Sequence, residues 1–265
     1  MLAGLAATVE EQPVRAPIDS SSSVLVVGAS RGLGLEFASK CLKRGATVYA
    51  THREPEELPP ALAAAAAPWD AAERLHAVRL DVGDDSSIAA AVATIQQLAG
   101  TDDPLTHVVH NAGIYGPTEP RGQVRRQSLM TTFEANAVGP LLIAQAVAPL
   151  LKRPVKSPVP PRTLPVYALM SSKMGSVEDN TSGGSYAYRM SKAALNICAK
   201  SLWHDLQGRA AVVLLHPGYV RTDMTGGSGL IDTDESVSGL LRAIEATGAD
   251  TPFRWVDYKA NLIPF

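Results

Sequence analysis

The chain alternates short runs of apolar, β-forming residues with longer stretches of helical character. The apolar runs occupy residues 24–28, 46–50, 75–81, 105–110, 165–171 and 211–216, and a last run at 253–258 is a candidate edge strand. The helical stretches occupy residues 32–44, 61–73, 86–99, 127–151 and 186–207. Near-continuous apolar runs are typical of strands buried on both faces. The alternation therefore predicts an α/β fold with a single, doubly wound parallel sheet and helices on both faces.

Three segments do not follow this alternation. Residues 152–165 contain five prolines, which predicts an extended loop. Residues 226–236 are rich in glycine and follow the sixth apolar run, at the sheet end where ligands bind, so we interpret them as a mobile lid. Residues 1–22 lack the basic start and continuous apolar core of a secretory signal, and we expect a flexible or loosely docked arm. The remaining residues, 23–265, have a length that suits one large α/β domain.

Charge and cysteine content narrow the classes of function. A formal net charge of -2 gives no support to a nucleic-acid or membrane-surface role, since both normally require a basic face. The longest apolar stretch, residues 135–151, is interrupted by polar residues, glycine and prolines, which makes it a poor membrane span. Cys41 and Cys198 form neither a CxxC pair nor a metal-ligand spacing. We therefore expect a cytoplasmic protein with no metal, no nucleic-acid partner and no membrane.

The segment SYAYRMSKAAL (185–195) contains two tyrosines and a lysine at helical spacing. Residues four apart lie on one helix face, so Lys192 lies one turn beyond Tyr188, whereas Tyr186 has Met190 at that place. A tyrosine that exchanges protons near neutral pH needs a pKa roughly three units below its usual value of about 10. An ammonium group about 4 Å away supplies energy of that order at an effective dielectric constant near ~20. The spacing therefore favours Tyr188 as the reactive residue, Lys192 as the group that lowers its pKa, and Tyr186 as a packing or pocket-wall residue.

The first apolar run leads into a glycine-rich turn, GASRGLG (28–34). Its glycines, Gly28, Gly32 and Gly34, allow a tight turn and let a pyrophosphate approach the backbone, and the following helix offers free N–H groups to the anion. The spacing differs from G-x-G-x-x-G, and no Gly-Lys-Ser/Thr follows as a P-loop would require. The turn predicts a dinucleotide site, with a mere packing turn as the alternative.

Four motifs in this order resemble the short-chain dehydrogenase/reductase family. They are the glycine turn, HNAG (110–113), the Tyr188–Lys192 pair with a serine before it, and HPGYVRTDM (216–224). Within the family, GGSYAYRMSKAALN and TDM are similar to sniffer-type carbonyl reductases and C-factor-like proteins. One departure is His110, which stands where the family commonly has asparagine. The resemblance implies a Rossmann-type fold and residues 23–265 as a single dinucleotide-binding catalytic domain.

The resemblance also implies a catalytic site made of Asn136, Ser172, Tyr188 and Lys192. Tyr188 would exchange a proton with the substrate oxygen, and Lys192 would also hold the nicotinamide ribose. Ser172 would hydrogen-bond the substrate oxygen, with Ser171 as the alternative. Asn136 would anchor a water in the proton relay to Lys192.

Cofactor choice depends on two arginines. Arg31 in the glycine turn and Arg53 after the second apolar run suit the 2′-phosphate of NADP(H), and the alternative is that both are solvated surface residues. Glu54 is the nearest acid, and we expect Pro55 to turn it away. The full set of cofactor-binding residues that the resemblance implies is Gly28, Ser30, Arg31, Gly32, Leu33, Gly34, Arg53, Asp81, Val82, Asn111, Ala112, Gly113, Tyr188, Lys192, Pro217, Gly218, Val220 and Thr222.

Three functions remain to be weighed. The leading hypothesis is an NADPH-dependent oxidoreductase that reduces an aldehyde or ketone, with a small-molecule carbonyl or alcohol as its substrate. The alternative is a dinucleotide-binding regulatory protein with little turnover. A nucleotide-sugar epimerase or dehydratase is disfavoured, because few residues follow HPGYVRT to form a substrate region. By family analogy, residues 127–151 and 186–207 predict a possible homodimer.

Overall fold

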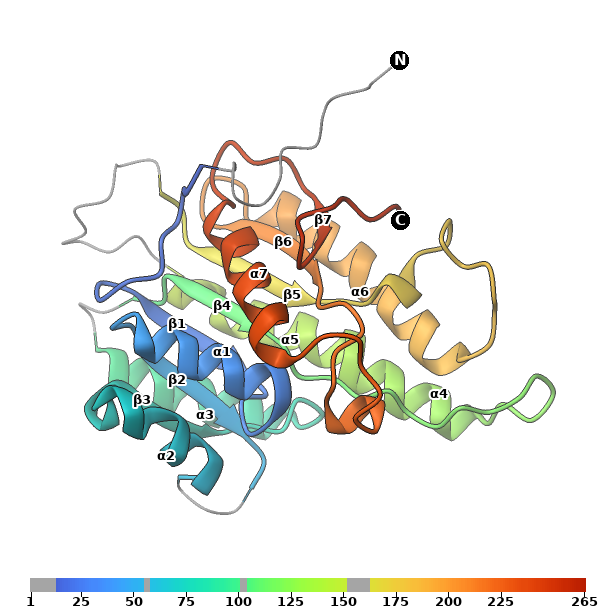
Figure 1. Ribbon diagram of the computed structural model, residues 1–265, viewed down its shortest axis with the longest axis horizontal. Helices are drawn as coiled ribbons and strands as arrows, with labels where there is room; N and C mark the ends of the chain where they lie inside the picture. Colours follow the sequence, from blue (N-terminus) through green and yellow to red (C-terminus); the bar gives the residue numbers. More distant parts are fainter. Residues whose placement is uncertain (1–12, 55–57, 101–103, 152–162) are drawn as a thin grey trace.

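The computed structural model describes residues 13–54, 58–100, 104–151 and 163–265, and all structural statements refer to these. They build one seven-stranded sheet in which every paired strand is parallel, in the order β3-β2-β1-β4-β5-β6-β7 (Figure 1). The strands are β1 Ser23–Val27, β2 Thr47–His52, β3 Leu75–Arg79, β4 His107–His110, β5 Val166–Met170, β6 Ala211–His216 and β7 Trp255–Asp257. The predicted Rossmann-type sheet is confirmed, including its edge strand.

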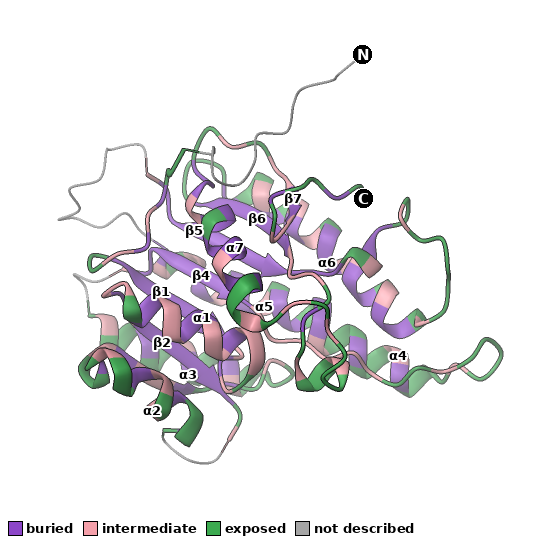
Figure 2. Ribbon diagram, viewed as in Figure 1, coloured by how far each residue is buried: buried purple, intermediate pink, exposed green. Residues whose placement is uncertain are grey.

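Helices cover both faces of the sheet because alternate strand residues point to opposite sides. Val24 and Val26 of β1 pack with Phe37 and Leu240 on one face. That face carries α1 (Gly32–Lys43), α2 (Pro60–Ala66) and α7 (Thr233–Glu245). The other face carries α3 (Asp85–Ala99), α5 (Gly139–Val147) and α6 (Tyr186–Asp205), with α4 (Arg126–Phe133) packed along α6. In Figure 2 the strands and the inner sides of the helices are buried, as expected for a doubly wound core.

Helix α7 was not predicted, and the first residues of the helix fall in the segment interpreted as a lid. Asp232 begins the helix by accepting a hydrogen bond from the backbone N–H of Glu235 at 2.8 Å. Four apolar residues then recur at helical spacing and are buried in the core: Val237, Leu240, Leu241 and Ile244. The lid predicted over residues 226–236 therefore ends at residue 232, where the helix begins.

The segment before β1 packs against the domain. The backbone N–H groups of Arg15 and Ala16 donate to the carbonyl oxygen of Glu245 at 2.7 and 2.9 Å. Ala16 and Ile18 are buried, and Nε2 of His107 lies 3.1 Å from the carbonyl oxygen of Ala16. Of the flexible or loosely docked arm predicted over residues 1–22, residues 15–18 are docked, whereas residues 1–12 lie outside the described part of the chain.

The chain that follows β7 folds back on that strand. Ile263 donates its N–H to the carbonyl oxygen of Trp255 at 2.9 Å, and Asp257 donates to that of Asn261 at 3.0 Å. Val256 and Leu262 form an antiparallel bridge. The outer edge of β7 is thus covered by the chain itself.

One helical stretch of the described residues, Arg126–Leu150, is long and apolar enough by length and composition to cross a membrane. A core helix of a soluble protein passes the same test, and Ile143, Ala144 and Val147 in this stretch belong to the core beneath α5. Most of the proline-rich loop predicted at 152–165 lies outside the described residues.

Candidate active site

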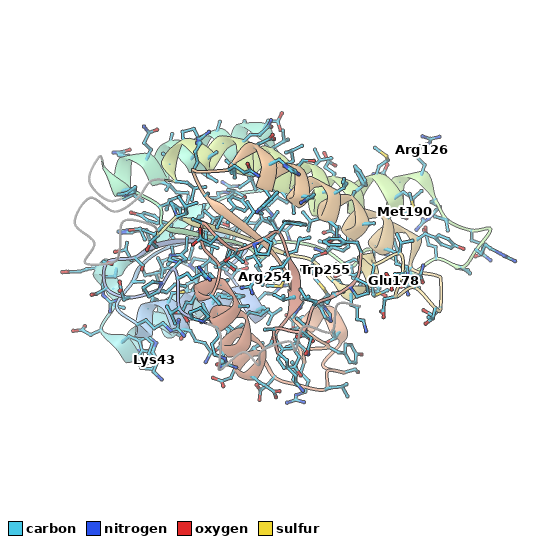
Figure 3. The ribbon with its side chains drawn as sticks, turned by 90° about the horizontal axis from the view of Figure 1, so that it is seen from above. Lys43, Arg126, Glu178, Met190, Arg254 and Trp255 are labelled. Atoms are coloured by element: carbon cyan, nitrogen blue, oxygen red, sulfur yellow. The ribbon has the colours of Figure 1, made fainter. Side chains whose placement is uncertain are left out.

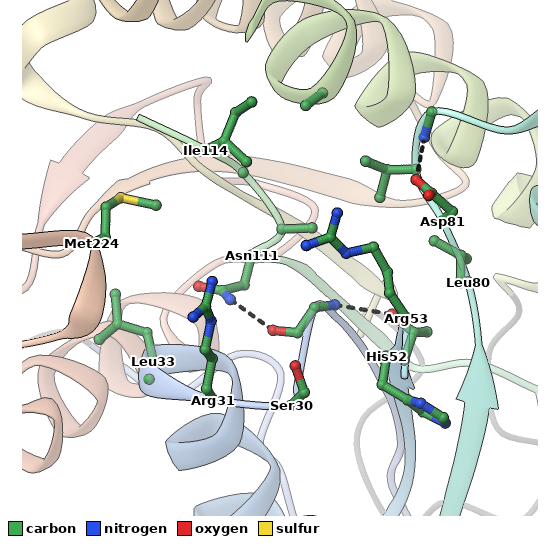
Figure 4. Close-up of a pocket in the computed structure, with 18 of the residues that line it drawn as sticks. Ser30, Arg31, Leu33, His52, Arg53, Leu80, Asp81, Asn111, Ile114 and Met224 are labelled. Carbon is green, nitrogen blue, oxygen red and sulfur yellow. Dashed lines mark hydrogen bonds between the residues drawn. The ribbon is translucent and has the colours of Figure 1, made fainter. Parts of the chain in front are cut away.

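A cavity of about 340 Å³ opens at the carboxyl ends of the strands (Figure 4). It lies where β1 is flanked by β2 on one side and β4 on the other, the point at which strand order reverses and at which doubly wound sheets bind ligands. Twelve of the predicted cofactor residues line it: Gly28, Ser30, Arg31, Gly32, Leu33, Arg53, Asp81, Val82, Asn111, Ala112, Gly113 and Thr222. Residues of the α4 end, among them Thr131 and Glu134, close another wall.

The glycine turn forms the floor of this cavity. Gly28 has a φ of 81°, and a Cβ there would lie 2.8 Å from Cα of Ala112, so only glycine fits. The turn is held by two hydrogen bonds at 2.9 Å: from the N–H of Gly28 to Oγ1 of Thr51, and from Nδ2 of Asn111 to the carbonyl oxygen of Gly28. Gly34 packs against that same carbonyl group rather than lining the cavity. Helix α1 begins at the turn with no side-chain cap, which leaves its N-terminus available to an anion.

The two arginines reach the same cavity. Figure 4 shows the guanidinium groups of Arg31 and Arg53 extending into it from the glycine turn and from the end of β2. Arg31 also pairs with Asp223 at 3.3 Å, with both side chains mostly exposed. Both arginines therefore line this cavity.

Glu54 is not turned away as the sequence suggested. Its carboxylate accepts the backbone N–H of Arg53 at 3.0 Å and a hydrogen bond from the Ser30 side chain. Partial burial raises the pKa of Glu54, but these hydrogen bonds lower it by more. The pKa of Glu54 therefore lies below its ordinary value. An ionised carboxylate thus lies beside the backbone of Arg53 and the side chain of Ser30.

Tyr188 and Ser172 form a buried hydrogen-bonded pair. The two residues are 8% and 9% exposed, and their hydroxyl groups interact. Ser171, the alternative serine, instead donates to Oδ1 of Asn196 at 2.6 Å. Burial raises the pKa of Tyr188 to about 12, and the hydrogen bond from Ser172 offsets this only in part.

Lys192 lies beside Tyr188 but does not lower the tyrosine pKa as the spacing predicted. Its Nζ is 5.8 Å from the centroid of the Tyr188 ring and donates to the carbonyl oxygen of Met170 at 2.8 Å. Burial lowers the pKa of Lys192 to about 8. The Tyr188 pKa rises because removing a phenolate from water disfavours its charged form.

Asn136 lies in a π-helical turn, η4 (Glu134–Val138), between α4 and α5. Its Oδ1 accepts the N–H of Ile114 at 2.8 Å, and its Nδ2 donates to the carbonyl oxygen of Ile114 at 2.7 Å and to Ser191 at 3.0 Å. A Cβ on Gly113 would lie 2.9 Å from this Oδ1 and 3.4 Å from Nζ of Lys192. Asn136 therefore links the loop that follows β4 to Ser191, the residue next to Lys192. π-Helical turns of this kind are frequent at functional sites.

Six of the predicted cofactor residues do not line this cavity, namely Gly34, Tyr188, Lys192, Pro217, Gly218 and Val220, and neither do Asn136 and Ser172. Gly218 packs against Tyr258 and Ile231, Pro217 accepts a hydrogen bond from Ser236, and Val220 bridges to Ile231. These contacts hold the chain after β6 and bring Thr222 to the cavity wall.

Tyr115, which lies beside the reactive tyrosine, was not predicted. The ring of Tyr115 lies on that of Tyr188, with centroids 4.6 Å apart and planes tilted by 34°. The only signal for it in the sequence is an aromatic residue two positions after HNAG.

A doubly wound sheet, a glycine turn at its switch point and a buried Ser-Tyr-Lys group define a Rossmann-type oxidoreductase. The chain belongs to the short chain dehydrogenase family, whose family model matches residues 22–230. It is 39% identical over 163 residues to C-signal of Myxococcus xanthus, covering 61% of this chain and 93% of that protein.

Solved structures agree with this assignment. The carbonyl reductase Sniffer of D. melanogaster matches with a TM-score of 0.81 and 32% identity, over 92% of this chain and 99% of that one. A carbonyl reductase from Pseudomonas aeruginosa PAO1 in complex with NADP matches with a TM-score of 0.76 and 34% identity, over 92% and 99% of the two chains. The predicted likeness to sniffer-type and C-factor-like proteins is confirmed.

Proposed function

We propose that this protein is an NADPH-dependent reductase of aldehydes or ketones. The observation that carries the proposal is the buried Ser172–Tyr188 pair, with Lys192 beside it, near a cavity floored by the glycine turn. The likeness to carbonyl reductases, one of them in complex with NADP, supports it.

The cavity residues fit NADP(H). The uncapped N-terminus of α1 suits the pyrophosphate, and Arg31 with Arg53 suits the 2′-phosphate. Asp81 lies on the wall beside Val82, where an adenine would lie. Thr222 lies beside the glycine turn: a Cβ on Gly32 would be 3.7 Å from Cγ2 of Thr222.

A nicotinamide held in this cavity would supply a hydride to the carbonyl carbon. Tyr188 donates its hydroxyl proton to the carbonyl oxygen, while Ser172 holds that oxygen by a hydrogen bond. Burial raises the pKa of Tyr188 to about 12, so its hydroxyl group carries the proton at neutral pH. Lys192 lies beside the tyrosinate that forms, with its Nζ 5.8 Å from the ring centroid, and Asn136 holds the backbone at Ile114 in place.

The test is NADPH oxidation with 4-nitrobenzaldehyde, 2,3-butanedione and 9,10-phenanthrenequinone. Tyr188→Phe should lower kcat by about 10²–10⁴, the usual worth of a positioned proton donor, with NADPH binding unchanged by fluorescence. Tyr186→Phe is the matched control: this side chain is 37% exposed, and its kcat should stay close to that of the parent. A larger loss in Tyr186→Phe than in Tyr188→Phe would refute the assignment.

The alternative is a dinucleotide-binding regulatory protein with little turnover, for which the similarity to C-signal is the specific observation. It predicts tight NADPH binding with no oxidation of NADPH by any carbonyl compound. The same two measurements therefore separate the two functions.

A further inference from the structure

Tyr115 is anchored at both ends of its side chain. Its ring lies against Tyr188, and its hydroxyl group hydrogen-bonds the hydroxyl of Ser185 at 2.9 Å. Sδ of Met174 lies 3.9 Å from the same hydroxyl group. The side chain of Tyr115 thus connects the loop that follows β4 with the start of α6, the helix that carries Tyr188.

The backbone on either side of Tyr115 is also fixed. Ile114 makes two hydrogen bonds to the amide of Asn136. Gly116 has a φ of 71° and packs against the side chain of Thr132 in α4. The ring of Tyr115 is therefore held from behind and cannot move away from Tyr188 without breaking these contacts.

Ser185 adopts an unfavourable backbone conformation at the other end of this connection. Its φ is 44° and its ψ is 43°, a left-handed conformation that costs a serine energy and a glycine almost none. Gly183 and Gly184, the two residues before it, have positive φ as well. Ser185 does not cap α6 with its side chain. The hydroxyl group makes its hydrogen bond to Tyr115 instead, and this contact gives a reason for a serine at the position.

We propose that Tyr115 and Ser185 act together as positioning residues, which hold the ring of Tyr188 in the orientation that delivers its proton. The inference rests on the proposed reductase function. Backbone strain retained beside a reactive group is common where the strain serves the mechanism. The pair does not touch the reacting atoms and acts only through the Tyr188 ring.

Kinetics of single variants test this first. Tyr115→Phe and Ser185→Ala each remove the hydroxyl contact and keep the shapes of the ring and the backbone. Each should lower kcat on the order of tenfold, since small misplacements of a reacting group are costly, with KM and the dissociation constant for NADPH unchanged. Tyr219→Phe is the control, because this tyrosine is 50% exposed.

The double variant separates positioning from simple loss of stability. If the two residues act as one unit, Tyr115→Phe with Ser185→Ala should be no slower than either single variant. Multiplicative losses would contradict the proposal. Ser185→Gly relieves the strain, so it should lower kcat without lowering Tm; unchanged kcat in Ser185→Gly would also contradict it.

A measurement without turnover keeps this inference distinct from the reductase function. With 3-fluorotyrosine placed at position 188, the ¹⁹F NMR signal reports the ring environment. Tyr115→Phe and Ser185→Ala should each shift or broaden this signal, and Tyr219→Phe should not. An unchanged signal in both variants overturns the positioning role even if the enzyme is active, and a changed signal supports it even if no carbonyl compound is reduced.

Discussion

At the scale of single residues, sequence spacing identified which groups meet but not how their environment affects them. The i, i+4 spacing predicted that Lys192 lies beside Tyr188, and the order of the motifs predicted that Ser172 lies there too; both are found next to Tyr188. The direction of the Tyr188 pKa shift was wrong because it depends on burial, which spacing does not report. Tyr115 was missed because a single aromatic residue carries no pattern.

The arginines at the cavity lead to a prediction about cofactor choice. The parent should prefer NADPH over NADH by at least about tenfold in kcat/KM, since one charged hydrogen bond is worth about 1.5–3 kcal/mol. Arg31→Ala combined with Arg53→Asp should abolish this preference, mainly by raising KM for NADPH. Steady-state kinetics with both cofactors is the measurement.

A change at Glu54 should alter the cofactor preference in the opposite direction to the arginine changes. Its carboxylate lies at the backbone of Arg53 and would repel a 2′-phosphate, so Glu54→Gln should strengthen the preference for NADPH. Equal use of both cofactors by the parent protein would show that the arginines do not read the phosphate.

At the scale of helices and strands, the strands were predictable and two helical features were not. The sheet strands appeared as β-rich apolar runs because parallel strands are covered on both faces. Helix α7 carried the required signals, Asp232 at its start and apolar residues from Val237 onward, but glycines preceded it. The π-helical turn at Asn136 adds one residue to a turn inside a helix, and the hydropathy pattern does not show this.

The start of α7 gives a prediction about stability. Asp232→Ala removes the hydrogen bond to the N–H of Glu235 and should lower the free energy of unfolding by about 1 kcal/mol. Urea unfolding at neutral pH measures this. Asp250→Ala is the control, because among the described residues it pairs with Arg15 at 3.6 Å on the surface, and such pairs contribute little. A loss in Asp250→Ala as large as that in Asp232→Ala would argue against the capping explanation.

At the scale of the whole molecule, the fold class followed from one property of the chain, its strand–helix alternation. The docking of residues 15–18 could not be predicted in the same way. It depends on single contacts with Glu245 and His107, residues that are distant in sequence.

Two buried histidines make the molecule sensitive to acid. Burial lowers the pKa of His107 to about 4 and that of His110 to about 3, below the unfolded value near 6.5. The unfolded chain therefore binds protons first, and stability is full above about pH 6.5 and falls as the pH drops toward about 4. At pH 4.5 the loss should be on the order of 2 kcal/mol for each histidine.

Urea unfolding of the parent at pH 7 and pH 4.5 measures this difference. His110→Asn should show a smaller difference between the two pH values, because it removes one of the titrating groups. His204→Asn, a change at the end of α6 outside the core, should show the parental difference. An equal difference in all three proteins would mean that other groups cause the acid loss.

The helices on one face suggest how the protein assembles. Several large apolar side chains of α4, α5 and α6 are exposed, namely Met130, Phe133, Leu141, Met190 and Ile197. Figure 3 shows Met190 at the same end of the molecule as Arg126, the first residue of α4, whereas the buried Trp255 lies nearer the middle. We propose that this face forms a homodimer, in which the side chains are covered by a second copy of the chain.

Light scattering should then give twice the chain mass of 27.9 kDa at micromolar concentration. Ile197→Glu should reduce the mass to that of one chain, because it places a charge in the interface. Leu262→Glu is the control, since Leu262 is 71% exposed but lies near β7. A single-chain mass for the parent protein would exclude the dimer.

The fold-back of the chain over β7 has a consequence for behaviour at high concentration. An open sheet edge exposes unpaired backbone groups that can recruit a strand from another molecule and start fibril growth. Here Ile263 and Asn261 already occupy hydrogen-bonding groups of Trp255 and Asp257. Residues 261–263 thus protect the β7 edge against pairing with a strand of another molecule. Two copies of the chain would therefore meet through the helices rather than through the β7 edge.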